Sequence, residues 1–200
     1  MVPSLTQTNT LKLDFKFITK CAMTYCVLSA GFSFLGIFLA EKGPLVSPVG
    51  ALNLHEISGH ILWGLVVGAV TLSIRYTILT GLFAVLIDSD HLIALTHLDA
   101  VSRMSHSIAF GIVAVIILMI LFGKKDYLFG ASVAAGVLAH LSFDIFVSND
   151  GKFPLFTPFY NHQISFPNQD WIYFEIAAIV IIGITTLLAK RTHREEIAKN

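Results

Sequence analysis

Long apolar runs, with the charged residues collected at their ends, are the feature that most restricts how this chain can fold. A bilayer core of about 30 Å requires a helix of roughly 17–25 mostly apolar residues, because backbone polar groups must be satisfied within the segment. We identify six such runs, at residues 21–40, 55–74, 77–95, 107–123, 127–147 and 171–189. Hydrophobic residues make up 55% of the chain and charged residues 13%, whereas soluble domains carry roughly a quarter of charged residues. The sequence therefore predicts an all-α protein, a polytopic transmembrane helical bundle of about six spans.

These runs divide the chain into three parts. Residues 1–20 form a polar N-terminal segment, residues 21–189 form a six-span membrane domain whose chemistry lies within 55–160, and residues 190–200 form a polar tail. The first run is longer than the apolar part of a signal peptide and lacks a small-residue cleavage site, so we expect a retained span. Arg75 and Tyr76 are the only break between the second and third runs. A single helix through them would overshoot the bilayer, so we expect a tight hairpin there.

Lysine and arginine residues near the ends of the runs predict the orientation. They accumulate in the N-terminal segment, at Arg75, at Lys124 and Lys125, and in the tail, which six spans place on one side of the membrane. The opposite side holds only Lys42, Arg103 and Lys152. Because cytoplasmic loops carry the excess of basic residues, we expect a multi-pass protein of the cell membrane with both termini in the cytoplasm.

Net charge and cysteine content argue against other classes of protein. The formal net charge is +0 and no basic stripe is present, so the sequence gives no indication of nucleic-acid binding. Cys21 and Cys26 are five residues apart inside an apolar run, which places them on different helix faces. We therefore expect packing residues, since neither disulfide geometry nor a known metal motif fits that spacing. The lipid bilayer is the one partner that the sequence predicts, and the oligomeric state stays open.

Residues 86–107 carry the densest chemistry of the chain. Asp88, Asp90 and His91 end the third run, and His106 opens the fourth. Asp88 and His91 share a helical face, whereas Asp90 is turned away, toward a second metal or a supporting position. Carboxylates at a helix C-terminus oppose the helix dipole, and a bound cation would reverse that penalty. An exposed polar turn would account for Asp90, but it would not account for the ionisable residues of the other runs.

Two further pairs lie on other predicted helices. His140 and Asp144 are four residues apart on one face of the fifth run, where a simple hydrogen bond between helices and a functional role are equally reasonable for the pair alone. Glu56 and His60 share a face of the second run, although the spacing HEISGH is not the zincin motif. The six-span topology brings all these residues to the non-cytoplasmic end of the bundle. The predicted ligands of a divalent metal, zinc or alternatively manganese, are His60, Asp88, His91, His106, His140 and Asp144.

Three other features lie near this predicted site. Arg103 precedes His106 by three residues and could hold an anionic substrate, or its side chain could extend to the membrane interface. The loop 148–170, rich in proline and aromatic residues, is expected to lie across the mouth of the site, either as a lid or, the interpretation we favour, as an interfacial belt. Glu175 in the sixth run is expected to pair within the bundle, and His97 and His162 are expected to be ordinary loop residues.

Four segments together resemble a known family. Residues 59–62, 87–91, 102–107 and 136–144 match, in order and approximate spacing, an early G-H-L-L, a P-D-x-D-H at a span end, an H-R-G-x-T-H-S and a G-Y-x-x-H-x-x-x-D. Over about residues 57–160 the chain thus resembles the YdjM-type, LexA-regulated inner-membrane family of metal-dependent hydrolases, and this resemblance implies metal-dependent hydrolysis. Ser102 replaces the first histidine of the third motif and Met104 replaces its glycine, which puts one ligand and the width of that turn in question.

The residues and the resemblance predict a membrane-bound metal-dependent hydrolase. A metal would lower the pKa of a bound water, Asp90 or Glu56 would act as the general base, and Arg103 would stabilise developing negative charge. The expected substrate is an amphiphilic, lipid-like ester or phosphoester that reaches the site from the bilayer. The alternative is a non-enzymatic metal-binding, transport or structural subunit of a membrane complex. Clustering of ionisable residues at one end favours a site over an ion pathway, which would need such groups through the membrane depth.

The predicted orientation can be tested by labelling a single cysteine in a chain whose Cys21 and Cys26 are replaced by alanine. Asn149→Cys should react with a membrane-impermeant maleimide added to intact cells, because residue 149 follows the fifth span. Lys125→Cys should react only after permeabilisation, because basic loops stay in the cytoplasm. The reverse pattern would contradict the topology.

Overall fold

A computed structural model describes residues 5–39, 47–48, 53–96, 100–148, 150–160 and 162–199 of the chain. Helices account for most of this part, and four short strands account for little of it. The helices are α1 (Leu5–Leu39), α2 (Leu54–Ala69), α3 (Ile74–Leu86), α4 (Ile108–Leu121), α5 (Tyr127–Val147) and α6 (Trp171–Lys199). Three 3₁₀ segments complete the helical part: η1 (Ile87–Thr96), η2 (Met104–His106) and η3 (Asn168–Asp170). The predicted all-α helical bundle is confirmed.

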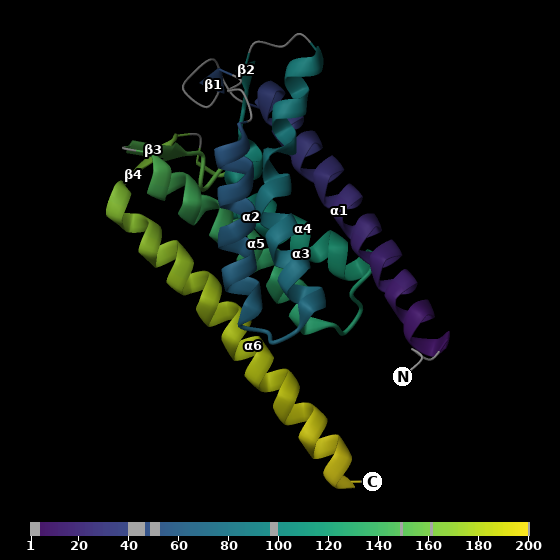
Figure 1. Cartoon of the computed structure of the whole chain (residues 1–200). Coiled ribbons are helices and arrows are strands. Elements are labelled where there is room, and N and C mark those ends of the chain that lie inside the picture. Colours follow the sequence, from purple (N-terminus) through teal and green to yellow (C-terminus); the bar gives the residue numbers. More distant parts are fainter. Residues whose placement is uncertain are drawn as a thin grey trace.

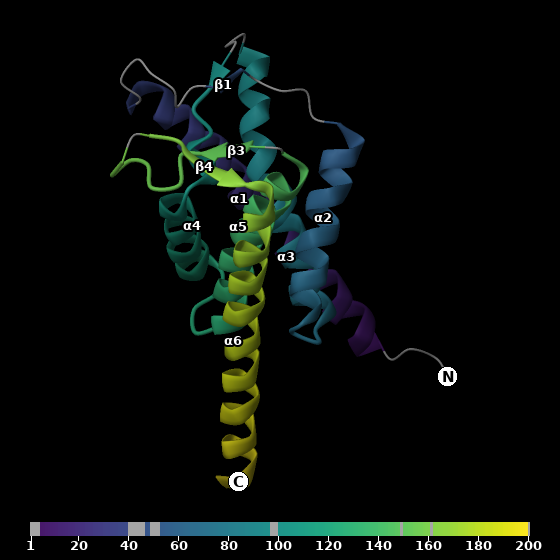
Figure 2. The same ribbon diagram turned by 90° about the vertical axis from the view of Figure 1, so that its left-hand side faces the viewer.

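The bundle is built around α5, which packs against α2, α3, α4 and α6. Helix α1 packs against α3, α4, η1 and η2. Figures 1 and 2 show the N-terminal end of α1 and the C-terminal end of α6 at one end of the molecule and the strands at the other. The chain therefore runs up and down between two ends, as six consecutive apolar runs predict.

Four of these helical segments are long and apolar enough to cross a membrane. They are Phe15–Phe38, Ile74–Ile93, Tyr127–Val147 and Asn168–Thr192. Helices α2 and α4 have 16 and 14 residues, somewhat fewer than the roughly 17–25 of a typical span. All six predicted runs are thus helical, and the two shorter ones, α2 and α4, both pack on α5.

Three predicted boundaries differ from the structure. The second and third runs do form a hairpin, but the break lies between Ala69 and Ile74, so Arg75 belongs to the first turn of α3. There the Arg75 guanidinium lies 4.1 Å from the centre of the Phe17 ring and 4.0 Å from Asp126. Arg75 makes both contacts from its position in the first turn of α3. Helix α1 begins well before residue 21, and α6 continues beyond residue 189, so parts of the predicted polar segments are helical.

The third run changes from α to 3₁₀ geometry at Ile87, just where its polar residues begin. Helix α1 holds this segment in place: the Ser29 hydroxyl donates to the Ile87 carbonyl, and the Ser89 hydroxyl donates to the Cys26 carbonyl at 2.8 Å. In a 3₁₀ helix, residues three apart eclipse each other. Asp88 and His91 are therefore stacked along one side of η1.

Two small antiparallel sheets cover the end of the bundle that carries the polar residues. Strand β1 (Ser47–Pro48) pairs with β2 (Ala100–Val101), and β3 (Asp150–Phe153) pairs with β4 (Ile164–Pro167). The β3–β4 hairpin belongs to the loop predicted to cross the mouth of the site. Its Phe153 is buried and lies parallel to the His106 ring, with 6.4 Å between ring centres.

The cysteines have the role predicted for them. Both are free, and Cys21 is fully buried in the same hydrophobic core cluster as Tyr25 and Phe83.

Glycines allow α2 and α3 to approach closely. A Cβ atom added at Gly64 would lie 2.7 Å from the Thr80 carbonyl oxygen and 2.8 Å from the Gly81 Cα. Gly68, one turn later, meets the backbone of Thr77 in the same way, at 2.8 Å. Small residues four apart are a common means of bringing membrane helices into contact. This contact fixes the position of α2, and with it the position of His60.

Gly64→Ala should destabilise the bundle by about 1–3 kcal/mol, because the added methyl group must push the α3 backbone away. Gly31→Ala is the matched control, since the described structure has nothing within 4 Å of a Cβ at that position. Unfolding in mixed detergent micelles, followed by circular dichroism, measures both. Equal stability of the two variants would contradict the close packing of α2 on α3.

Candidate metal centre

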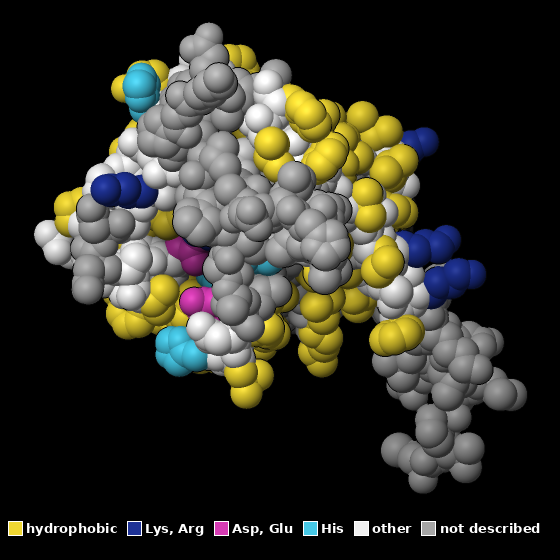
Figure 3. Space-filling view, turned by 90° about the horizontal axis from the view of Figure 1, so that it is seen from above, with side chains coloured by type: hydrophobic (Ala, Val, Ile, Leu, Met, Phe, Trp, Pro, Cys, Tyr) yellow, Lys and Arg dark blue, Asp and Glu magenta, His cyan; other side chains and the backbone are white. Residues whose placement is uncertain are grey.

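Four separate elements bring histidine and aspartate side chains to one place. His60 comes from α2, Asp88, Asp90 and His91 come from η1, His106 comes from η2, and His140 and Asp144 come from α5. All six residues predicted as metal ligands lie in this cluster. Figure 3 looks down on this end of the molecule, where acidic and histidine side chains are visible among hydrophobic ones.

Two aspartates, Asp88 and Asp144, occupy the centre of the cluster. His60 Nε2 lies 3.3 Å from a carboxylate oxygen of each. His106 Nε2 lies 3.5 Å from Asp88 and 3.7 Å from Asp144, and His140 Nε2 lies 3.7 Å and 3.4 Å from the same two residues. Three imidazole nitrogens therefore converge on two carboxylates.

Backbone contact fixes the orientation of His140. Its Nδ1 lies 2.7 Å from the Ala84 carbonyl oxygen, an acceptor, so Nδ1 carries the proton. Its Nε2 atom is buried and has no hydrogen-bond partner in the described structure. In the neutral ring that atom bears a lone pair that faces two carboxylates, an arrangement that is repulsive unless a cation or a proton lies between them. Metal-bound histidines commonly have their second nitrogen held in this way.

The three histidine rings also contact one another. His60 and His140 are stacked, with ring centres 4.0 Å apart and an angle of 15° between planes. His106 lies edge-on to His140 at 4.7 Å. Two imidazolium ions stacked at this distance would repel strongly, so the stack favours at least one neutral ring.

A chain of hydrogen bonds supports His106 from behind. His106 Nδ1 lies 3.0 Å from the Ser105 hydroxyl, which donates to Asp90 Oδ2 at 2.9 Å. The Ser33 hydroxyl of α1 donates to the same oxygen at 3.1 Å and accepts from the Ser105 amide. Burial and the nearby Arg103 guanidinium lower the pKa of His106 to about 4. This ring is therefore neutral at pH 7, with Asp90 behind it.

Arg103 places a positive charge beside the two central aspartates. Its Nη2 donates to Asp144 Oδ2 at 3.2 Å and lies 2.6 Å from His106 Nε2. The backbone of Arg103 is left-handed, with φ 50°, a conformation that L-residues other than Asn and Asp seldom adopt. In the resembled motif the glycine follows this arginine, and Met104 occupies that position without a positive φ. The left-handed backbone thus occurs at Arg103 itself, and the Arg103 side chain points into the cluster.

The formal charges of the side chains in the cluster indicate whether it suits a metal ion. Asp88, Asp90 and Asp144 bring three carboxylates, whereas Arg103 brings one guanidinium. Asp88 and Asp90 are 5% and 0% exposed, and buried charges are costly unless they are compensated. If all four histidines are neutral, the cluster has an excess of negative charge that a divalent cation would neutralise. The donor set fits such an ion.

Three overlapping groups of donors have ligand atoms within 4.8 Å of one another: His60, His140 and Asp144; Asp88, His106 and His140; and Asp88, Asp90 and His91. Asp88 and His140 each belong to two groups. Nitrogen and carboxylate donors of this kind suit zinc and also manganese.

Two other predicted residues have different surroundings. Glu56 is half-buried one turn before His60, and its charge acts on Arg103 without an ion pair between them in the described structure. Ser102, which replaces a motif histidine, donates to the Ser33 carbonyl at 2.6 Å and faces α1. Gly36 of α1 leaves the space for it, since an added Cβ would overlap the Ser102 side chain.

The remaining predicted residues lie away from the cluster or outside the described residues. His162 is exposed beside Tyr160, whereas His97 lies outside the described residues. Glu175 is 9% exposed on α6, and its Oε2 has no hydrogen-bond partner in the described structure. Ser142 of α5 is a hydrogen-bond partner of the Glu175 carboxyl group, which confirms the expected pairing of Glu175 within the bundle.

Sequence reasoning missed the serines behind His106. Ser105 could have been noticed, because it adjoins His106 and has a hydroxyl. Ser33 could not, because it lies in an apolar run 72 positions from Ser105, its hydrogen-bond partner. The signal, a buried serine on the face of α1 that also carries Ser29, becomes meaningful only when the partner helix is known.

Comparison with known proteins gives one match. No curated protein and no solved structure matches the chain. The model of the YdjM inner membrane protein family matches residues 54–199, which include every residue of the His/Asp cluster. The resemblance seen in the four motifs is confirmed, and the chain belongs to the YdjM inner membrane protein family.

Proposed function

We propose that this protein is a membrane-bound, metal-dependent hydrolase of amphiphilic esters or phosphoesters. One observation carries the proposal: a buried excess of carboxylate charge faced by imidazole nitrogens, in the His/Asp cluster at one end of a membrane bundle. Such an excess is stable only with a bound cation or with protonated histidines. The neutral state of His106 and the stacking of His60 on His140 favour the cation.

The residues that would hold the ion are those of the cluster. His60, His106, His140 and the two central aspartates would supply the first ligands, and His91 would join through Asp88. Zinc is our proposed ion, with manganese as the alternative. When bound, such an ion supplies Lewis-acid chemistry, activating water and polarising a phosphoryl or carbonyl oxygen.

Asp90 and Arg103 have supporting roles in the proposed site. Asp90 is fully buried and bonded to Ser33 and Ser105, so we assign it to the orientation of His106 in place of the proton transfer considered from sequence. Arg103, whose side chain is 26% exposed, can hold an anionic oxygen of a substrate through its guanidinium. Its present contact with His106 Nε2 means that the guanidinium must shift if that nitrogen binds the ion.

Glu56 is the better candidate for the general base, because it is half-buried and lies one turn before His60. In the proposed hydrolysis a water oxygen forms a bond to the phosphorus or carbonyl carbon, and the bond to the leaving oxygen breaks. The proton of that water passes to Glu56, and a proton returns to the leaving oxygen as the product departs.

A structural role is the second candidate function, favoured by the origin of the ligands. They come from α2, η1, η2 and α5, so an ion bound among them would crosslink four elements. Binding energy would then be folding energy. A metal-binding or transport subunit of a membrane complex belongs to the same non-enzymatic class.

Metal content tests the first step. Purified wild-type protein should carry zinc or manganese in elemental analysis, and His140→Ala should lose most of it, because it removes a nitrogen shared by two donor groups. His162→Ala, the matched control in an exposed loop, should keep the metal. Equal metal content in both variants would overturn the proposed centre.

Hydrolysis tests the second step. His106→Ala and Asp144→Asn should each abolish turnover of a panel of phosphoesters and carboxylesters, and a chelator should do the same to the wild type. The variants should stay folded, since helix packing supplies most of the stability. If a chelator instead collapses the melting temperature in detergent, and no panel member is hydrolysed, the structural role is correct and the enzyme is not.

A further inference from the structure

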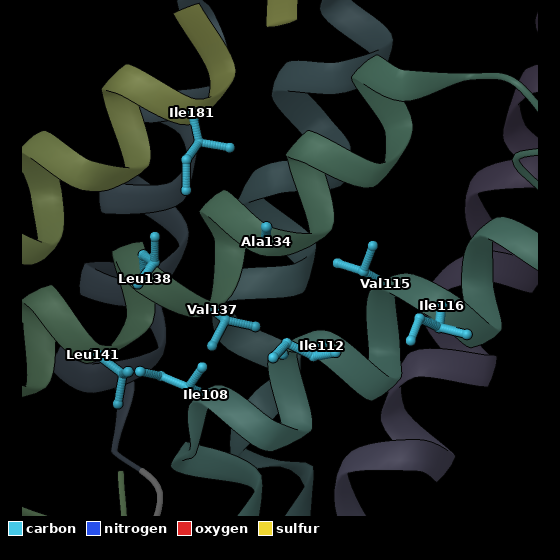
Figure 4. A pocket seen from close by; sticks show the side chains of 10 residues that line it. Ile108, Ile112, Val115, Ile116, Ala134, Val137, Leu138, Leu141 and Ile181 are labelled. Carbon is cyan, nitrogen blue, oxygen red and sulfur yellow. The ribbon is translucent and has the colours of Figure 1, made fainter. Parts of the chain in front are cut away.

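An apolar groove runs along the outside of the bundle next to the metal centre. It has a volume of about 400 Å³ and lies between α4 and α6, with α5 as its floor. Figure 4 shows the isoleucines of α4 opposite Val137 and Leu141 of α5, with Ile181 of α6 across the groove. Its lining side chains are all apolar: Ile108, Ile112, Val115, Ile116, Ala134, Val137, Leu138, Leu141 and Ile181, with Gly111 between them.

One end of the groove adjoins the site in sequence and in space. Ile108 follows His106 by two residues, and its amide donates to the Leu155 carbonyl at 2.9 Å, just beyond the hairpin residue Phe153 that covers His106. Leu141 follows His140 directly on α5. The groove and the ligands therefore occupy neighbouring faces of the same helix, and the groove leads away from them along α4.

The glycine in the groove is not explained by helix packing. A Cβ added at Gly111 would lie 3.5 Å from Val137 Cγ1, an ordinary contact, whereas one at Gly64 would overlap the neighbouring helix. A glycine inside a helix is less favourable than alanine by roughly 0.5–1 kcal/mol. At Gly111 the missing side chain leaves the floor of the groove open.

The shape of the groove selects its occupant. From Ile108 to Ile116 the lining runs along α4 for about 12 Å. Every lining side chain is apolar, so the groove offers no hydrogen-bond partner to a polar occupant. A hydrocarbon chain of the surrounding bilayer matches this lining. The isoleucine walls are partly exposed, Ile112 at 56% and Ile181 at 38%, so the groove opens sideways toward the surrounding lipid.

We propose that this groove holds one acyl chain of a phosphate-bearing membrane lipid, with the phosphate at the His/Asp cluster beside Arg103. The inference rests on the proposed function in that it names the substrate class of the same site. The groove alone would bind the hydrocarbon, and the Arg103 guanidinium, together with the cation that the cluster would hold, would bind the phosphate. The groove would thus bind the apolar end of the lipid, and the His/Asp cluster with Arg103 would bind its polar end.

Photo-crosslinking tests chain binding without any hydrolysis. The full chain is reconstituted into phosphatidylethanolamine–phosphatidylglycerol vesicles containing a trace of phosphatidylglycerol with a diazirine on its acyl chain. After illumination, adducts should concentrate on residues 108–116 and 134–141. Gly111→Leu should lower them about tenfold, because a filled groove excludes the chain. Gly31→Leu, on a lipid-facing position of α1 with nothing within 4 Å, should leave them unchanged.

Diacylglycerol with the same diazirine chain tests the head group. It should label the groove several-fold less than the phospholipid does, and it should label α1 equally. Equal labelling of the groove by both lipids, or groove labelling that Gly111→Leu leaves intact, would overturn the inference. Ile112→Trp, which narrows the groove from its exposed wall, repeats the test if Gly111→Leu does not fold.

Turnover separates this inference from the proposed function. The ratio of long-chain to short-chain phosphoester hydrolysis should fall in Gly111→Leu and stay at the wild-type value in Gly31→Leu. If the wild type is labelled in the groove, Gly111→Leu removes that labelling, and the wild type hydrolyses no phosphoester, then the groove is supported and the hydrolase is contradicted. If the protein hydrolyses phosphoesters, but Gly111→Leu leaves the ratio of long-chain to short-chain hydrolysis unchanged, then the hydrolase is supported and the groove is contradicted.

Discussion

The proximity of Asp88 and Asp144, each of which has a carboxylate oxygen 3.3 Å from His60 Nε2, is the constraint on which the rest of the centre depends. Two carboxylates brought together away from water repel each other and lose hydration, so they persist only if cations or hydrogen-bond donors surround them. In the structure, three imidazoles and one guanidinium surround them. Each of these partners comes from a different element or a different turn. The helices must therefore be fixed against one another before the charges can be balanced.

Close helix contacts provide that fixation. The glycines of α2 allow it to lie against α3, and the hydroxyl groups of α1 hold the 3₁₀ segment that carries Asp88. In a membrane, contacts between small residues and between polar groups take the part that burial of apolar surface takes in water. The packing of the bundle and the geometry of the site depend on each other, because the polar groups that hold η1 in place lie next to the side chains that would bind the ion.

Much of this arrangement could be predicted from the sequence. Apolar length predicted the helices, and the topology of six runs predicted that His60, His106 and Asp144 meet at one end. What the sequence could not provide was backbone detail inside the runs. The change to 3₁₀ geometry at Ile87 depends on serines of α1 that are distant in sequence. The hairpin break lies before Arg75, whose side chain, in the first turn of α3, contacts Phe17 of α1 and Asp126 at the start of α5. Asp90 was expected to turn away from Asp88, but the two carboxylates belong to one group of possible ligands with His91. The hydrogen bonds of Asp90 with Ser33 and Ser105 could not be predicted without the fold.

The role of Ser33 bears on what counts as the working unit of this protein. The family is recognised over residues 54–199, yet the wall behind His106 includes a helix that ends at Leu39. Among the described side chains, α1 contributes no histidine or carboxylate to the cluster, and the region of family similarity does not reach it. The Ser33 hydroxyl of α1 nevertheless donates to Asp90 and accepts from the amide of Ser105, the neighbour of His106. A domain boundary drawn from sequence similarity would therefore cut through the hydrogen-bond network that keeps the centre in register, and α1 functions as part of the site's scaffold.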